Sequence, residues 1–223
     1  MNIIEFNGLP GVGKSTLCNS LINELSNKSI LIADLGDIVF RNQKTKLDNY
    51  FYIMKVIFSI KRINFNMAVF KFTLDYRLSK SNIVYALRLI KLYNKLKTSM
   101  EKDEFKYIIL EEGIVQYITS IPHDKLIRKN ENFYKLCDII KKDFEDILQI
   151  NCLLNVTELL KRIRNRNSLK NRFDTLPEDE LKRVLKIKNE NIKLVRNIFN
   201  NEISIDTKKR LDENLNIILS RIS

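Results

Sequence analysis

The chain has 223 residues, of which 44% are hydrophobic and 30% charged, a balance typical of a folded globular protein that excludes a disordered one. No window of about 18 residues is apolar and free of charge, so the sequence predicts no membrane-spanning helix. The net charge of +12 fits a Lys-rich solvated surface, a phosphorylated ligand or a nucleic acid. The solvated surface is favoured, because Lys and Asn are spread along the whole chain.

The first predicted element is a short apolar strand, Asn2 to Phe6, which leads into a glycine-rich loop. Residues 8–16 read GLPGVGKST and fit G-x-x-x-x-G-K-[ST], the pattern of a loop that binds nucleotide phosphates. Apolar residues repeat at helical spacing over 17–25, so a helix should follow and point its positive dipole end at the same place. The loop lysine can reach the β- and γ-phosphates and the serine hydroxyl can bind Mg²⁺. The residues expected to bind ATP here are Gly8, Gly11, Val12, Gly13, Lys14, Ser15 and Thr16.

A second strand is predicted over 29–33, and it ends in the acidic stretch Asp34-Leu35-Gly36-Asp37. Ligands of parallel sheets bind at the carboxyl ends of the strands. Asp34 is therefore a candidate for acceptor binding and Asp37 a candidate catalytic residue, and either could be the base that orients the acceptor.

A helical, aromatic and basic insertion is predicted over 41–104, which is far more chain than a crossover between two strands needs. The favoured interpretation is packing of the core and of a lid. Two alternatives are an acceptor pocket walled by aromatic side chains and a basic amphipathic surface that touches membranes.

The third predicted strand, 107–110, ends in Glu111-Glu112-Gly113. Glu111 directly follows the apolar run, where phosphoryl-transfer proteins place an acidic residue near the metal. It could bind Mg²⁺ through water or accept a proton from the acceptor. Glu112 should point elsewhere, because neighbouring residues of an extended chain face opposite sides.

A fourth strand is predicted over 150–154, followed by an arginine-rich segment at about 157–175. Arg162 and Arg166 share a helix face, and with Arg172 they suit a closing lid that neutralises charge during phosphoryl transfer. The alternative is a solvated basic helix. A fifth strand, 202–205, ends at Asp206, and a closing helix is predicted over 208–222.

The loop at 8–16, the lid segment 160–166 with Arg172-Phe173-Asp174, and Ile205-Asp206-Thr207 resemble P-loop nucleoside and nucleotide kinases, most of all thymidylate kinase-like proteins. The resemblance spans 1–223 and is weak over 41–104. It implies one three-layer α/β domain whose five parallel strands have the order 2-3-1-4-5. It also implies ATP and Mg²⁺ as cofactors and places Asp206 in the strand that leads to the adenine-binding loop.

The chain departs from thymidylate kinases after the third strand, where they usually have Asp-Arg and this chain has Glu111-Glu112-Gly113. The arginine that commonly helps to hold the acceptor phosphate is missing. The stretch is more similar to the Asp-Glu-Gly-x-x-Gln of uncharacterised P-loop kinases. An acceptor-binding arginine that the family has before this strand could be Arg77 or Arg88. The kinase class is therefore better supported than thymidylate as the acceptor.

We expect a kinase that transfers the γ-phosphoryl group of ATP to a nucleotide, a nucleoside or a similar small acceptor. A polynucleotide end kinase or nucleic-acid-binding ATPase, favoured by charge alone, and an ATP-binding module without turnover are the alternatives. GTPases are disfavoured, since no Asn/Thr-Lys-x-Asp segment follows the fourth strand, and His123, the only histidine, makes a His-based catalytic triad improbable. A homodimer is left open.

The cysteines and the start of the chain bear on the cellular compartment. Cys18, Cys137 and Cys152 lack metal-ligand or CxxC spacing, which predicts buried free thiols. The loop begins at Gly8 and leaves no room for a signal peptide, so we expect a cytoplasmic protein.

Overall fold

The computed structural model describes residues 2–27, 32–34, 62–76, 78–103, 105–144, 146–165 and 173–222, with the strand at 32–34 described by its backbone alone. Parallel strands form one sheet in the order β2-β3-β1-β4-β5. Their bounds are β1 (Asn2–Asn7), β2 (Ile32–Asp34), β3 (Tyr107–Leu110), β4 (Leu148–Leu153) and β5 (Glu202–Asp206). The helices are α1 (Lys14–Asn27), α4 (Ile63–Leu74), α5 (Lys80–Lys102), α6 (Ile114–Ser120), α7 (Glu131–Phe144), α8 (Val156–Arg164), α9 (Glu178–Arg196) and α10 (Leu211–Ile222).

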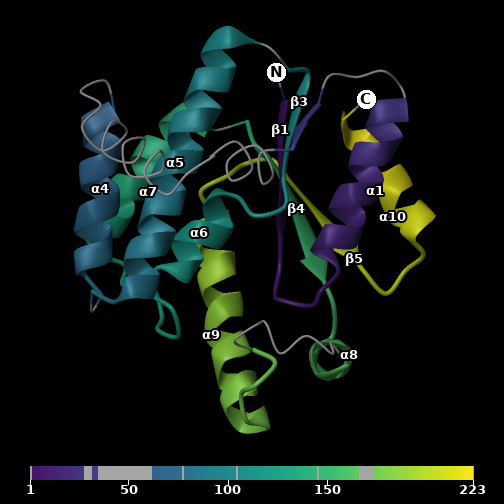
Figure 1. The fold of residues 1–223 in the computed structure, drawn as a ribbon. Coiled ribbons are helices and arrows are strands. Elements are labelled where there is room, and N and C mark those ends of the chain that lie inside the picture. The colour runs from purple at the N-terminus through teal and green to yellow at the C-terminus, as the bar shows by residue number, and fades with distance from the viewer. Residues whose placement is uncertain are drawn as a thin grey trace, which may run out of the picture.

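Helices cover both faces of the sheet, which confirms the predicted α/β class with a parallel sheet. Figure 1 shows α1 and α10 on one side and α4, α5, α6, α7 and α9 on the other. Two apolar clusters fill these layers. The side chains of β1 alternate between them: Ile4 and Phe6 belong to the α1 and α10 side, and Ile3 to the other.

The expected strand ends differ from the observed ones by one or two residues. β4 begins at Leu148, two residues before the predicted start, because Leu148 is buried and pairs with Ile4 of β1. The predicted second strand began at 29, and residues 29–31 lie outside the described part of the chain. The closing helix begins at Leu211 rather than at 208, since Asp206 to Lys209 form a hydrogen-bonded turn.

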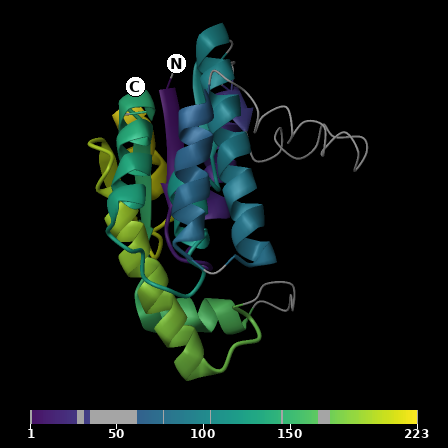
Figure 2. The same ribbon diagram turned by 90° about the vertical axis from the view of Figure 1, so that its left-hand side faces the viewer.

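The part of the predicted insertion that the structure describes is a pair of helices, α4 and α5, and residues 41–61 lie outside it. α4 carries a single charge, Lys71, and buries Phe65, Val69 and Phe72 against its neighbours α5 and α7. Figure 2 shows α4 and α5 side by side along one edge of the molecule. This arrangement supports the core-packing interpretation for these two helices.

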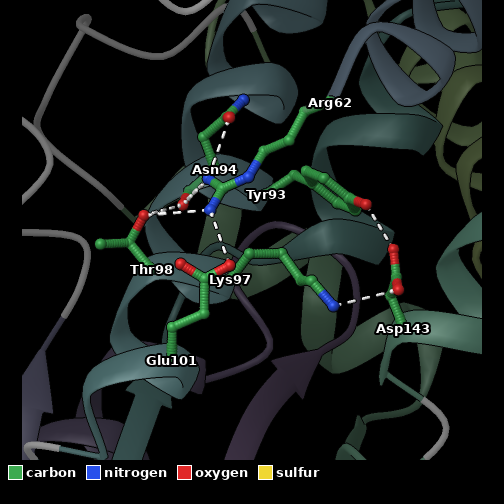
Figure 3. Close-up of polar contacts among 7 residues, drawn as sticks. All are labelled: Arg62, Tyr93, Asn94, Lys97, Thr98, Glu101 and Asp143. Carbon is green, nitrogen blue, oxygen red and sulfur yellow. Dashed lines mark hydrogen bonds and ion pairs between the residues drawn. The ribbon is translucent and has the colours of Figure 1, made fainter. Parts of the chain in front are cut away.

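Polar contacts tie the start of α4 and the end of α7 to α5 (Figure 3). The guanidinium of Arg62 donates to the main-chain oxygen of Asn94 and, at 3.0 Å, to its side-chain oxygen. The Tyr93 hydroxyl donates to the carboxylate of Asp143, and Lys97 Nζ lies 3.1 Å from the same carboxylate. Burial, reinforced by the Asp143 hydrogen bond, raises the pKa of Tyr93. Asp143 therefore joins two helices through two partners.

Replacing Asp143 by alanine should lower the free energy of unfolding by about 1–3 kcal/mol, because the Tyr93 hydroxyl and Lys97 lose their partner in a partly buried place. Urea unfolding followed by circular dichroism measures the loss. Glu101→Ala is the control: the ion pair between Glu101 and Arg62 is 3.4 Å long and Glu101 is 64% exposed, so the change should stay within about 0.5 kcal/mol. Equal losses in the two variants would contradict the assigned role of Asp143.

Two further predictions concern cysteines and membranes. The three cysteines are buried thiols outside any disulfide, which confirms the prediction made for them. Among the described residues, no helix has the length and apolar character needed to span a bilayer.

Candidate active site

The glycine-rich loop joins β1 to α1 at the carboxyl edge of the sheet. Gly8, Gly11 and Gly13 have φ values of 144°, 89° and 105°, which residues other than glycine rarely adopt. A Cβ atom on Gly8 would lie 2.6 Å from the main-chain oxygen of Cys152 in β4, so the loop also needs glycine there for close approach. These residues give the backbone the tight turn that the motif predicts.

Lys14 opens α1 and folds back over the loop. Its Nζ atom donates to the main-chain oxygens of Gly8, at 2.9 Å, and Leu9, at 3.1 Å. The ammonium group therefore lies over the loop, beside the positive end of the α1 dipole. Both features favour an anion at this point.

Ser15 and Glu111 come together from distant parts of the sequence. The Ser15 hydroxyl donates to the carboxylate of Glu111, which follows β3, and Glu111 is partly buried. Glu112 is exposed and acts on a different group: the pKa of Tyr117 is raised by burial first and by the charge of Glu112 second. The two neighbouring carboxylates thus have different surroundings, and Glu111 is the one beside the loop.

The Ser15 and Glu111 pair fits a magnesium ion in its chemistry. Mg²⁺ prefers hard oxygen ligands and usually takes one or two carboxylates together with water and substrate phosphates. The described residues include no cluster of three or more His, Cys, Asp or Glu side chains that could hold a metal by itself.

Arg162, in the last turn of α8, lies against the loop. Its guanidinium is 3.4 Å from the main-chain oxygen of Val12 and 3.5 Å from that of Thr207, and its Nε atom is 3.6 Å from Glu158. It thus connects the loop to the turn after β5. Arg166 and Arg172 lie outside the described residues.

A small cavity lies beside the loop, between α1, α8 and the turn after β5. Asp206 holds this turn together: its carboxylate accepts the N–H of Lys208 at 2.9 Å, and its main-chain oxygen accepts from Asn214 at 3.0 Å. Asp206 is not among the residues that line the cavity. It stabilises the turn after β5, which forms one wall of the cavity. The lining residues are Gly13, Thr16, Leu17, Arg162, Thr207, Lys209, Leu211 and Asn214.

The acceptor-binding candidates are only partly described. Arg88 lies on α5 with its guanidinium 5.6 Å from the centre of the Tyr85 ring. Burial raises the pKa of Tyr117, the charge of Glu112 adds to this shift, and the charge of Arg88 opposes it. Asp34 ends β2 and pairs with Ile109 of β3 through the backbone. Asp37 and Arg77 lie outside the described residues, so the choice between the two arginines stays open.

Sequence reasoning missed Glu5, a carboxyl group in the middle of β1. Glu5 is fully buried, accepts the N–H of Val115 at 2.8 Å and accepts from Gln149 at 3.3 Å. Burial raises the pKa of Glu5 to about 7, and the hydrogen bonds oppose this shift. A charged residue within an apolar strand was the signal available in the sequence.

Replacing Glu5 by glutamine should flatten the pH dependence of stability. The folded protein keeps a proton on Glu5 that the unfolded chain releases near pH 4.5, so its stabilising contribution is complete below pH 4.5 and is lost as the pH rises through about 7. This loss amounts to about 3 kcal/mol in the wild type and should vanish in the variant.

The measurement is urea unfolding at several values between pH 4.5 and pH 8. Glu202→Gln, on β5 and partly exposed, is the matched control for the loss of a carboxylate from the same sheet. Parallel slopes for Glu5→Gln and the wild type would exclude a raised pKa at Glu5.

No protein-family model and no curated protein matches the chain. Among solved structures, deoxyadenosine kinase from M. mycoides with bound dATP matches with a TM-score of 0.51 and 14% identity, over 99% of this chain and 98% of that chain. Structures of the same enzyme with the products dCMP and dCDP, and with dCTP, match over the same shares with TM-scores of 0.49 and 0.47 at 12% and 14% identity.

The dATP complex exceeds a TM-score of 0.5, and at 14% identity this likeness shows the fold alone. The chain has the fold of this nucleoside kinase. The predicted P-loop kinase fold is thereby supported, while thymidylate kinases are not singled out.

Proposed function

We propose that the protein is an ATP- and Mg²⁺-dependent kinase that phosphorylates a nucleoside or a similar small acceptor. The observation that carries the proposal is the meeting of Ser15 and Glu111 beside Lys14, at the mouth of a loop whose backbone is shaped for phosphates. The fold shared with deoxyadenosine kinase agrees with it.

The loop residues would bind and orient the triphosphate. Backbone N–H groups of the loop and the Lys14 ammonium would hold the β- and γ-phosphates, and Ser15 and Glu111 would hold Mg²⁺. Bound there, the metal would neutralise charge on the phosphate oxygens. An acceptor oxygen would attack the γ-phosphorus while the bond to the β–γ bridging oxygen breaks, ADP leaves, and the acceptor proton passes to a carboxylate. Asp34 and Asp37 are the candidates for this base.

The nucleotide base of ATP would occupy the cavity beside the turn after β5. Thr207 and Arg162 line it, and Gly13 connects it directly to the phosphate loop. Arg162 would then contact both the base and the phosphates. The arginine-rich segment would close over the site from α8.

The acceptor is proposed to be a nucleoside rather than a nucleoside monophosphate. Thymidylate kinases usually have an arginine after the third strand that helps to hold the acceptor phosphate, whereas this chain has Glu112 there. A carboxylate would repel a phosphate and could accept a hydrogen bond from a hydroxyl group. Arg88 or Arg77 would complete the acceptor side, and a nucleotide acceptor is the alternative.

A screen with γ-labelled ATP tests this function. The purified protein is incubated with Mg²⁺ and a panel of nucleosides, nucleoside monophosphates and a 5′-hydroxyl oligonucleotide. Label on a nucleoside supports the proposal, and label on a monophosphate or on the oligonucleotide supports a nucleotide kinase or an end kinase. ATP binding without transfer to any acceptor favours a non-catalytic module. Steep salt dependence of oligonucleotide binding would support the nucleic-acid alternative, and sedimentation would show whether a homodimer forms.

Replacing Arg162 by alanine should raise the KM for ATP and lower kcat, each by about tenfold, because the guanidinium lies against the loop as well as in the segment proposed to close. A lid arginine that acts only during phosphoryl transfer, as the sequence predicts, would affect kcat more than the KM for ATP. Steady-state kinetics at varied ATP concentration separates the two. Arg183→Ala, on α9 and 56% exposed, is the control. Wild-type values of both constants for Arg162→Ala would show that the residue belongs to a solvated helix.

A further inference from the structure

The first turn of α6 is capped by a side chain from another element. Its N-cap residue, Gly113, has no side chain that could accept a hydrogen bond, and its backbone is extended. The carboxylate of Glu5, on β1, accepts the N–H of Val115 at 2.8 Å, and the N–H groups of Ile114 and Gln116 also lower its pKa. Every helix begins with N–H groups that have no partner within the helix, and Glu5 accepts hydrogen bonds from those of α6.

The contact leaves no space for a side chain at Gly113. A Cβ atom built there would lie 2.4 Å from Cδ of Glu5 and 2.6 Å from its Oε1. Behind the carboxylate, Gln149 of β4 donates to Oε2 at 3.3 Å, and the amide oxygen of Gln149 accepts from Asn7. The carboxyl group is thus fixed between the sheet and α6.

This arrangement connects the two halves of the proposed metal site. We name Glu111, Glu112 and Gly113 the acidic turn. β1 runs directly from Glu5 into the loop that leads to Ser15. The Glu5 carboxylate packs closely against Gly113, the last residue of the acidic turn, and accepts the N–H of Val115 two residues further on. Two residues before Gly113, the carboxylate of Glu111 accepts a hydrogen bond from the Ser15 hydroxyl.

We infer that Glu5 is a positioning residue, which holds the acidic turn so that Glu111 stays beside Ser15. The inference rests on the proposed function, because the role of Glu5 depends on the metal that Ser15 and Glu111 would hold. Glu5 is fully buried and acts only through its neighbours. Partners that orient metal ligands in this way typically contribute about 10–100-fold to metal affinity or activity.

At a pH above about 7, where the Glu5 carboxyl group is ionised and at which the measurements below are made, the variant Glu5→Gln keeps the shape of the side chain and removes its charge. Its amide can still accept from Val115, and the new NH₂ group can donate to Gln149 if that amide turns around. The freed Gln149 donor then faces the side-chain amide of Asn7, whose oxygen has no hydrogen-bond partner in the described structure and can accept from it if this amide turns around as well. We therefore expect a folded variant in which the acidic turn is held less firmly.

The first measurement is metal affinity without turnover. Binding of Mn²⁺ to the complex with a non-hydrolysable ATP analogue, followed by electron paramagnetic resonance, should weaken about 10-fold or more in Glu5→Gln. Gly113→Ala, which displaces the same carboxylate from the other side, should weaken it similarly and serves as the second variant. Glu202→Gln, on the same sheet and hydrogen-bonded to Asn151, is the matched control and should bind Mn²⁺ like the wild type.

A double-mutant cycle with Glu111→Gln separates positioning from general stabilisation. If Glu5 acts through Glu111, adding Glu5→Gln to Glu111→Gln should cause no further loss of Mn²⁺ affinity. Equal losses in both backgrounds, or unchanged affinity in Glu5→Gln, would overturn the inference. This readout needs no acceptor, so it tests the role of Glu5 independently of phosphoryl transfer. A protein that binds the metal and ATP but never transfers phosphate would refute the proposed function without deciding the role of Glu5.

Discussion

Replacing Lys14 by alanine should lower phosphoryl transfer by at least about 100-fold while the fold survives. The Lys14 ammonium donates to the main-chain oxygens of Gly8 and Leu9 in the loop, and its charge is placed for the β- and γ-phosphates. Removing it takes away stabilisation of the charge that shifts during transfer. Since its Nζ contacts are with the loop, the apolar clusters around the sheet should keep their packing.

The measurement is transfer of labelled phosphate to the best acceptor of the screen, alongside a thermal melt. Lys182→Ala is the control, because Lys182 lies on α9 in an exposed pair with Glu178 and away from the loop. A turnover close to that of the wild type in Lys14→Ala, with the melt unchanged, would remove the basis for the kinase proposal.

The phosphate loop could be predicted from the sequence because its chemistry is local. Its glycines, Lys14 and Ser15 lie within eight residues, and each is required by the backbone or by the phosphates. The β1, β3 and β4 strands were likewise visible as short apolar runs. Their ends shifted because pairing partners, such as Ile4 for Leu148, decide where a strand begins.

Glu5 could not be placed in the same way, because its partners are distant in the sequence. Val115 and Gln149 lie more than a hundred residues away, and their proximity follows from the strand order β3-β1-β4. The role of Asp206 in its turn was likewise not visible in the sequence. The resemblance places it in the strand that leads to the adenine-binding loop, and the structure adds that it holds the turn that carries Thr207.

Glu111→Gln should lower transfer about 100-fold and weaken its Mg²⁺ dependence, while Glu112→Gln should do much less to both. The reason is the direction of the two side chains. The Glu111 carboxylate accepts from Ser15, the loop residue that the motif assigns to the metal, whereas Glu112 is exposed and acts on Tyr117. The glutamine keeps the shape of each side chain and removes only the charge, so the difference between the variants reports the electrostatic role.

A titration of activity with Mg²⁺ for the wild type and both variants decides between the two residues. If Glu112→Gln lowers transfer without changing the Mg²⁺ concentration at half-maximal activity, Glu112 belongs to acceptor binding rather than to the metal. If Glu112→Gln instead shifts that concentration more than Glu111→Gln does, the metal role belongs to Glu112. The contact between Ser15 and Glu111 would then hold the loop to β3 in the absence of nucleotide, and the acidic turn would have to rotate before the metal binds.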